Sequence, residues 1–439
     1  MTATARVAIA AAAIVGIGAI VGMGAIGAGT GPLHPAPARA GSATLDSTAV
    51  SHPPNASSPA PPPPDWLGAA SRASEETGPS FALVAFDSAA GSWGVACAAS
   101  QIACGARIPA AAAGAGAVAS LGPGATRLHA ALAALAAGAD ADSALAILRA
   151  EPGDPAARQA IAIARDGRAA AVSGTRLPGY SGARARPGFA CAGFGLRGQE
   201  TLAAMESVFF GTPGAGRHPR STDAPLEEAS SRELGARLLR GLEAAERAEG
   251  EPFEHRGMDA SAALLVVRAD ADPGSGSDRL VDLRVDQGED PVSALGRLYA
   301  RDAETFLPAA HVRFGDAARR GGDDSTARRE YAAAEAGFRA AVARAPKDGG
   351  ALNELAWFLA TRGGDPSEAL RFAEAAVLAR GDDPNILDTL AEAAYRAGNL
   401  ERAIEAAERA ARLARGNARY AERLRAFRAA RTALAPSSR

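Results

Sequence analysis

The sequence predicts a mixed α+β protein in which two antiparallel sheets flanked by helices precede an all-α module. Three observations lead to this fold class. Short apolar runs joined by turn residues alternate with helical patterns between residues 80 and 305. Small residues recur with a period of 34 residues in the last third of the chain. A Pro-rich stretch without apolar periodicity separates both regions from an apolar N-terminus.

Composition limits the classes of function. The chain has 439 residues, of which 47% are hydrophobic and 22% charged, so it has room for about two or three globular domains. Its net charge of −2 lacks the basic excess that a nucleic-acid partner requires. The 3 Cys and 6 scattered His form neither a disulfide framework nor a metal-ligand spacing. We therefore expect no nucleic-acid partner, no metal and no cofactor.

Residues 1–40 have the layout of an export signal. Arg6 precedes an uncharged apolar stretch over residues 7–29, and Ala38-Arg39-Ala40 supplies a small-x-small cleavage site. The same apolar stretch is long enough to cross a bilayer, so a membrane anchor is the alternative. Both interpretations place the folded part outside the cytoplasm of a bacterial-type cell, as a periplasmic, secreted or outward-facing anchored protein.

Residues 41–79 are predicted to be a disordered linker. Four consecutive prolines at 61–64, and further prolines before them, stand among Ser, Ala and Thr. Such a segment buries too little apolar surface to offset the entropy lost on ordering. We expect it to be extended and to hold the folded part away from a membrane, or to be trimmed.

The region 80–305 reads as strand pairs and helices. Ser80–Phe86 has the composition of a buried strand, Asp87–Gly91 that of a turn, and Trp93–Ala99 that of the partner strand. Further strands are expected at 114–120, 160–164, 169–172, 189–196, 261–268 and 280–285, and helices at 128–148, 199–210, 230–249 and 291–305.

An ordered series of short matches in this region resembles a known family. It includes Ser80-Phe81-Ala82-Leu83-Val84, Trp93-Gly94-Val95-Ala96, Arg158-Gln159, Ser173-Gly174, Pro187-Gly188-Phe189 and Ser261–Val267. The series resembles a bacterial family of N-terminal-nucleophile (Ntn) hydrolase-like proteins known as domain of unknown function 1028. The resemblance covers about residues 80–300, roughly half of the chain. It implies a four-layer αββα Ntn-hydrolase-like sandwich and, by analogy of fold, an amidohydrolase ancestry.

The resemblance makes Ser80 the candidate catalytic residue. In Ntn hydrolases the first residue of the mature chain is the nucleophile, and its own α-amino group acts as the base. Signal cleavage after Ala40 leaves residues 41–79 in front of Ser80. A second cleavage at Pro79-Ser80, in an expected exposed linker edge, is therefore required. In the alternative interpretation Ser80 simply begins a strand.

Four positions depart from the family pattern by replacing a hydrogen-bonding group with an apolar residue. They are Leu121, Ala183, Phe194 and Ala260. The loss of these hydrogen-bonding groups removes a polar site, whereas the apolar replacements preserve a core that can still fold. They favour a degenerate enzyme, or pseudoenzyme.

The cysteines allow two interpretations. In the first interpretation Cys97 and Cys104, which are close in sequence, form a disulfide, because an exported protein meets an oxidising environment. In the other, both are reduced and buried. Cys191 is expected to be a core residue.

The last third of the chain is a helical repeat. Ala369, Ala373 and Ala376 recur 34 residues later as alanines at 403, 407 and 410. This period, with small residues where paired helices meet, resembles the tetratricopeptide repeat and predicts a repeat module over 315–435 that ends in a capping helix. Its groove is expected to bind a peptide or a partner protein. The alternative is a module that only extends the first domain or dimerises it.

Two functions are consistent with these features. In the first, the chain is an exported adaptor or scaffold, in which a degenerate Ntn-hydrolase-like domain at 80–305 is coupled to a protein-binding repeat module at 315–435. In the second, it is an N-terminal-nucleophile amidohydrolase that hydrolyses amide bonds with Ser80 after cleavage before that residue.

Overall fold

The computed structural model describes residues 78–122, 127–151, 153–211, 233–249, 260–269 and 277–434. The predicted signal or anchor at 1–40 lies outside the described residues, as does the linker up to residue 77. Among the helices of the described ranges, none combines the length and apolar character that a bilayer span requires.

A six-stranded antiparallel sheet forms the centre of the first domain. Its order is β10-β9-β2-β1-β8-β7, so the hairpin β1–β2 lies in the middle. The strands are β1 Ser80–Asp87, β2 Ser92–Ala99, β7 Tyr180–Arg186, β8 Phe189–Leu196, β9 Ala260–Arg268 and β10 Arg279–Gly288. β1, β2, β8 and β9 are apolar almost throughout because both faces of these strands are covered.

A four-stranded antiparallel sheet faces the first sheet. Its order is β3-β4-β5-β6, and its strands are β3 Pro109–Ala112, β4 Gly116–Leu121, β5 Gln159–Ala164 and β6 Ala169–Ser173. Between the two sheets lies a layer of buried side chains that we call the intersheet core; it includes Ala82, Val84, Cys97, Leu121, Ile161, Phe194 and Leu265.

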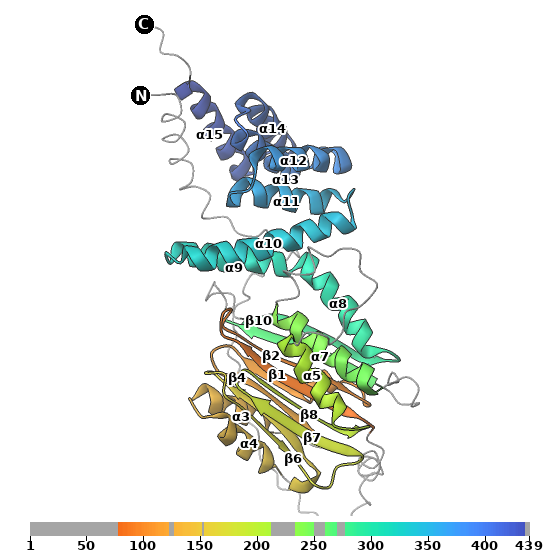
Figure 1. Ribbon diagram of the computed structural model, residues 1–439. Helices are drawn as coiled ribbons and strands as arrows, with labels where there is room; N and C mark the ends of the chain where they lie inside the picture. Colours follow the sequence, from red (N-terminus) through yellow and green to blue (C-terminus); the bar gives the residue numbers. More distant parts are fainter. Residues whose placement is uncertain are drawn as a thin grey trace, which may run out of the picture. The chain divides into compact units, whose positions relative to one another are not determined.

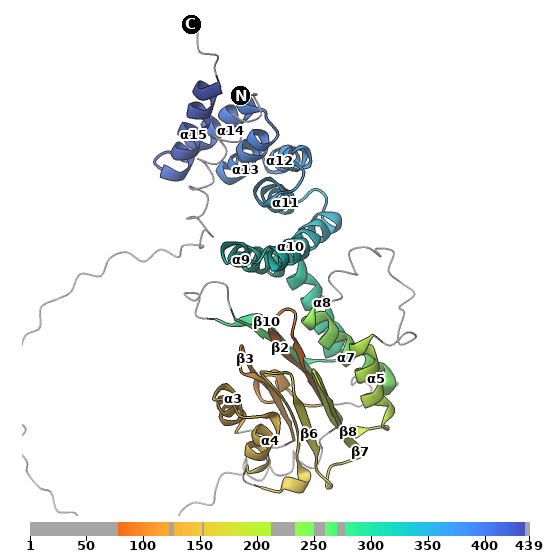
Figure 2. The ribbon, with the colours of Figure 1, turned by 60° about the vertical axis from the view of Figure 1, so that its left-hand side comes forward.

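Helices cover the two outer faces. Helices α5 (Glu200–Phe210), α7 (Leu234–Glu249) and α8 (Pro291–Thr305) pack on the six-stranded sheet. Helices α3 (Leu128–Ala136) and α4 (Ala141–Arg149) pack on the four-stranded sheet. Figures 1 and 2 show these helices on opposite sides of the paired sheets. The domain is thus the predicted four-layer αββα sandwich.

The structure differs from the sequence prediction at the helix expected over 128–148. It contains two helices there, because Gly138 has a left-handed φ of 99° and Asp140 caps a new helix by accepting a hydrogen bond from the Ser143 amide. Strands β3 and β7 were not predicted. The helix α8 coincides with the predicted range 291–305, since Asp290 caps it and Pro291 occupies its first turn.

Eight helices fill the described residues from 291 to 434. After α8 they are α9 Leu307–Arg320, α10 Asp324–Arg344, α11 Gly349–Arg362, α12 Pro366–Arg380, α13 Pro384–Arg396, α14 Leu400–Leu413 and α15 Ala418–Leu434. Short turns join them into the hairpins α9–α10, α11–α12 and α13–α14. The six repeated alanines at 369, 373, 376, 403, 407 and 410 are buried, as the tetratricopeptide-like period requires.

A buried ionic cluster connects the first helical hairpin to the sheet domain. Arg268, at the end of β9, donates two hydrogen bonds to Glu330 of α10, at 2.9 and 3.3 Å, and its guanidinium lies 3.8 Å above the ring of Phe314. His311 of α9 contacts Glu330 through Nδ1 at 2.9 Å and lies 3.6 Å from Glu233, just before α7, through Nε2. Helices α9 and α10 therefore pack on the sheet domain through charges as well as apolar contacts.

Candidate functional site

Ser80 faces the intersheet core. Ala82 and Val84 belong to that core, and side chains on a strand alternate between its faces, so Ser80 points the same way. It pairs with Phe194 on β8 and with Ala99 on β2, and Ala99 in turn pairs with Ser261 on β9. These four residues form one row across the inner face of the six-stranded sheet.

A second polar residue, Gln159, faces the intersheet core from the four-stranded sheet. It pairs with Leu121 on β4 and Ser173 on β6, and it is fully buried. Its Nε2 donates to the Ser173 hydroxyl at 2.9 Å and to the carbonyls of Gly182 and Gly193 at 2.8 and 2.9 Å. Within the part of the chain that the structure describes, its Oε1 has no hydrogen-bond partner. Gln159 thus links the two sheets close to Ser80, because Gly193 pairs with Phe81.

The Pro79–Ser80 peptide bond is buried. Both residues are inaccessible, unlike the exposed edge that the sequence predicts. The Pro79 carbonyl accepts two hydrogen bonds from Ser100, one from its backbone N–H at 3.0 Å and one from its hydroxyl at 3.2 Å. As long as this peptide bond is intact, the nitrogen of Ser80 is an amide and cannot act as a base.

Three of the four apolar departures from the family pattern lie at the intersheet core. Leu121 is 1% exposed and Phe194 2% exposed within this core, and Ala183 packs against it. Ala260 is also buried but belongs to the opposite face of the sheet, beneath the helices. Of these four residues, Phe194 is the direct neighbour of Ser80 across the sheet, Leu121 and Ala183 lie elsewhere at the same core, and Ala260 lies on the opposite face.

The two neighbouring cysteines are also at the intersheet core. Cys97 and Cys104 are buried free thiols with their Sγ atoms 3.6 Å apart. The hydrogen bond with Cys97 lowers the pKa of the Cys104 thiol, while the hydrogen bond with Cys104, together with burial, raises that of Cys97. Cys191 is buried on the other face of the six-stranded sheet, as expected for a core residue, and burial raises the pKa of its thiol to about 12.

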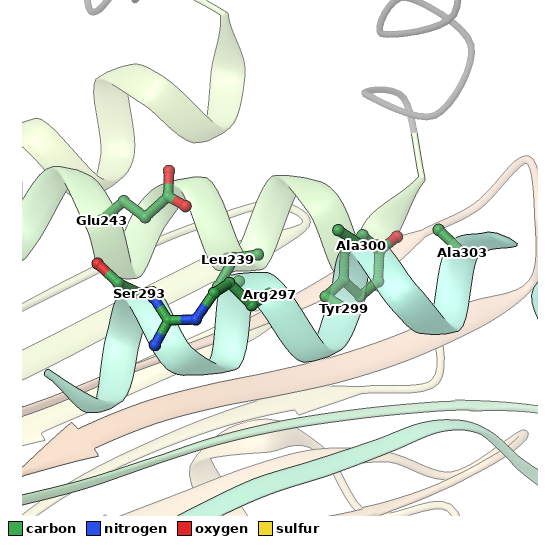
Figure 3. A pocket seen from close by; sticks show the side chains of 8 residues that line it. Leu239, Glu243, Ser293, Arg297, Tyr299, Ala300 and Ala303 are labelled. Carbon is green, nitrogen blue, oxygen red and sulfur yellow. The ribbon is translucent and has the colours of Figure 1, made fainter. Parts of the chain in front are cut away.

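A groove of about 510 Å³ lies between α7 and α8, on the outer helical layer (Figure 3). It is lined by Leu239, Glu243, Ser293, Gly296, Arg297, Tyr299, Ala300 and Ala303. The six-stranded sheet separates this groove from Ser80, which faces the opposite side. The groove therefore contains none of the residues that the sequence analysis proposed for catalysis.

The stability of the protein is expected to depend on pH through Glu246, which lies one turn from Glu243 on α7. Its Oε1 is buried without a partner among the described residues, and burial raises its pKa to about 7 from an ordinary 4.5. Because the folded state binds the proton more tightly, its contribution to stability is lost as pH rises through about 7. From about pH 5 to 8, we expect the wild type to lose on the order of 1–2 kcal/mol relative to Glu246→Gln in urea unfolding. Parallel pH profiles would contradict this.

An ionic and aromatic cluster spans the repeat module. Asp388 and Glu392 of α13 are almost fully buried beneath Arg419 and Arg423 of α15. Arg419 donates to Asp388 at 2.7 Å, and Arg423 lies 2.6 Å from the same carboxylate. The guanidinium of Arg423 lies 5.3 Å from the centre of the Trp357 ring on α11. Two partly exposed guanidinium groups and an aromatic ring thus lie together across three helices.

Comparisons with known proteins agree with the resemblance found in the sequence. Residues 80–295 match the model of a family of unknown function, DUF1028. A crystal structure of a protein from Silicibacter pomeroyi, assigned to the same family, is 27% identical to this chain. The alignment covers 51% of this chain and 89% of that one, with a TM-score of 0.40. None of the curated proteins matches the chain.

Proposed function

We propose, from the premise that residues 80–295 form a domain of the DUF1028 family, that this chain is an exported adaptor. In this proposal the Ntn-hydrolase-like domain is catalytically inactive and serves as a scaffold. The helical module after it binds a peptide or a partner protein. The N-terminal segment exports the chain or tethers it to a membrane.

The environment of Ser80 is the observation that carries the proposal. In the intact chain its nitrogen is acylated by Pro79, and its neighbours across the sheet are Phe194 and Ala99. Leu121 contributes a further apolar side chain from the facing sheet. An amidohydrolase needs a base for the nucleophile and donors for the oxyanion, and these apolar groups supply neither.

The cluster around Trp357 supports a binding role for the helical module. An aromatic ring beside guanidinium groups offers both stacking and charged hydrogen bonds to a peptide. The buried carboxylates of Asp388 and Glu392 hold the two partly exposed arginines in place. A partner with carboxylate and apolar groups fits this combination.

The proposal is tested first by the state of the N-terminus. We expect protein recovered from its native exported fraction to keep residues ahead of Ser80, and the mature Ser80→Ala chain to begin at the same residue as the wild type. Intact mass and N-terminal sequencing measure both. A wild-type chain that begins at Ser80, with an uncut Ser80→Ala chain, would overturn the adaptor in favour of the enzyme.

One observation favours the alternative, an amidohydrolase that uses Ser80. The Pro79 carbonyl, which Ser80 would attack during self-cleavage, already accepts two hydrogen bonds from Ser100. Such donors stabilise the oxyanion that forms at this carbon. The Ser80 hydroxyl would add to the Pro79 carbonyl carbon, the C–N bond would break, and water would hydrolyse the resulting ester. The products are a Pro79 carboxylate and a free Ser80 amine.

A screen with amides of peptide, cell-wall and acyl-amino-acid type separates the two functions. The amidohydrolase predicts turnover that is lost in Ser80→Ala and strongly reduced in Ser100→Ala. The adaptor predicts no turnover by any form of the chain, including one whose sequence has been made to begin at Ser80.

A further inference from the structure

The strongest unassigned feature is the pair of thiols at the end of β2. Cys97 lies in β2, and Cys104 begins the short 3-10 turn at Cys104–Ala106 that follows it. The Sγ of Cys97 donates to that of Cys104 at 3.6 Å, and both side chains are fully buried. A bond of about 2.05 Å needs an approach of only about 1.5 Å, within reach of small side-chain rotations.

The backbone around Cys104 is held in this position by independent contacts. Its N–H donates to the Ser261 hydroxyl at 2.9 Å, and that hydroxyl donates to the carbonyl of Gln101 at 2.5 Å. The N–H of Ala103, which adopts a left-handed φ of 55°, donates to the Asp286 carbonyl at 2.8 Å. The fold therefore brings the two sulfurs together even without a covalent bond.

We propose that Cys97 and Cys104 are the site of an intramolecular disulfide, which forms when the chain folds in the presence of a small-molecule disulfide such as oxidised glutathione. The bond closes a ring over residues 97–104 that contains Ser100. The ring thereby restricts the backbone of Ser100, whose N–H and hydroxyl donate hydrogen bonds to the Pro79 carbonyl. The proposal is independent of whether Ser80 is catalytic.

The chemistry is a thiol–disulfide exchange. The Cys104 thiolate attacks one sulfur of oxidised glutathione, forms a mixed disulfide and releases one glutathione thiolate. The Cys97 thiolate then attacks the Sγ of Cys104 and releases the second. Two protein thiols lose two protons and two electrons, and one glutathione disulfide is reduced to two thiols.

Cys191 provides an internal reference. It lies on the outer face of the six-stranded sheet, whereas Cys97 and Cys104 lie on the inner face. Its Sγ contacts the Leu202 carbonyl at 3.8 Å, on the helix side. The sheet therefore separates it from the pair, and it stays a free thiol.

The test counts thiols in the full chain after refolding with a glutathione redox couple. Titration in denaturant without reductant should find one thiol among the 3 Cys of wild type, none in Cys191→Ser and two in Cys104→Ser. After reduction the wild type should give three. We expect the oxidised protein to melt roughly 5 °C above the reduced one.

Peptide mapping gives the same answer without a variant. Arg72 and Arg107 are consecutive tryptic sites, so one peptide carries both cysteines and Cys191 falls in another. The bond lowers the mass of the first peptide by about 2 Da, the two hydrogens lost on oxidation. Three free thiols in folded, glutathione-treated wild type, or a bond that includes Cys191, would overturn the proposal.

Discussion

Replacing Glu330 by alanine is expected to lower the free energy of unfolding by about 3–5 kcal/mol. Glu330 accepts two hydrogen bonds from Arg268 and contacts His311, and all three side chains are nearly inaccessible to water. The substitution leaves a buried guanidinium without its carboxylate, which costs more than the intact pair contributes. Urea unfolding of the full chain measures the loss.

Glu335→Ala is the matched control for this prediction. Glu335 lies on the same helix and pairs with Arg339 at 2.8 Å, but its side chain is 37% exposed. An exposed pair of this kind contributes below about 1 kcal/mol. If Glu330→Ala costs no more than Glu335→Ala, the buried cluster does not hold the helical hairpin to the sheet domain.

The same cluster predicts acid sensitivity. Burial alone would raise the pKa of Glu330, but the hydrogen bonds with His311 and Arg268 and the charges of both hold it at about 2. Its contribution is therefore present above an ordinary glutamate pKa of 4.5 and is lost as pH falls from there toward 2. Glu330→Ala should lose less stability than the wild type over this interval.

The second large effect is expected at Gln159. Replacement by leucine, of similar volume, should cost about 2–4 kcal/mol because the carbonyls of Gly182 and Gly193 lose a buried donor. Ser173→Ala is the comparison: it removes only one of the three acceptors, at a cost of about 1 kcal/mol. Thermal and urea unfolding report both changes.

The proposed role of Gln159 also makes a structural prediction. Because its amide ties β5 to β7 and β8, its loss should increase hydrogen exchange of the backbone amides in β7, the edge strand of the six-stranded sheet. Exchange in α13 and α14, far along the chain, should not change. A Gln159→Leu protein as stable as the wild type would mean that the apolar contacts alone hold the sheets together.

Much of the fold could be predicted because local signals and tertiary packing agree. The turn Asp87–Gly91 separates two apolar runs that do form β1 and β2, and the repeated alanines mark where helices meet. β3 and β7 are different: both are edge strands, one an alanine run that begins at Pro109 and one that carries Arg184 and Arg186. Edge strands need no apolar pattern, so periodicity did not reveal them.

The candidate site was only partly predictable for a similar reason. Ser80 was identified through a family resemblance, and the apolar side chains of Leu121 and Phe194 at the same core through departures from that family. Gln159 and Ser100 were missed as site residues, because their importance depends on which strands pair. One signal was available for Gln159: it is a polar residue that continues the inward-facing alternation of Ile161 and Ile163.

The strand order has a consequence for how the chain reaches its folded state. The β1–β2 hairpin forms from neighbouring residues, but its flanking partners are made much later, with Ser80 beside Phe194 and Ala99 beside Ser261. During synthesis the β1–β2 hairpin is therefore complete before either of its neighbouring strands, β8 and β9, has been made. Pairings that span so much sequence fold slowly and expose the nascent chain to aggregation. We therefore expect refolding of the full chain to be slow and to lose more protein to aggregation as the chain concentration rises.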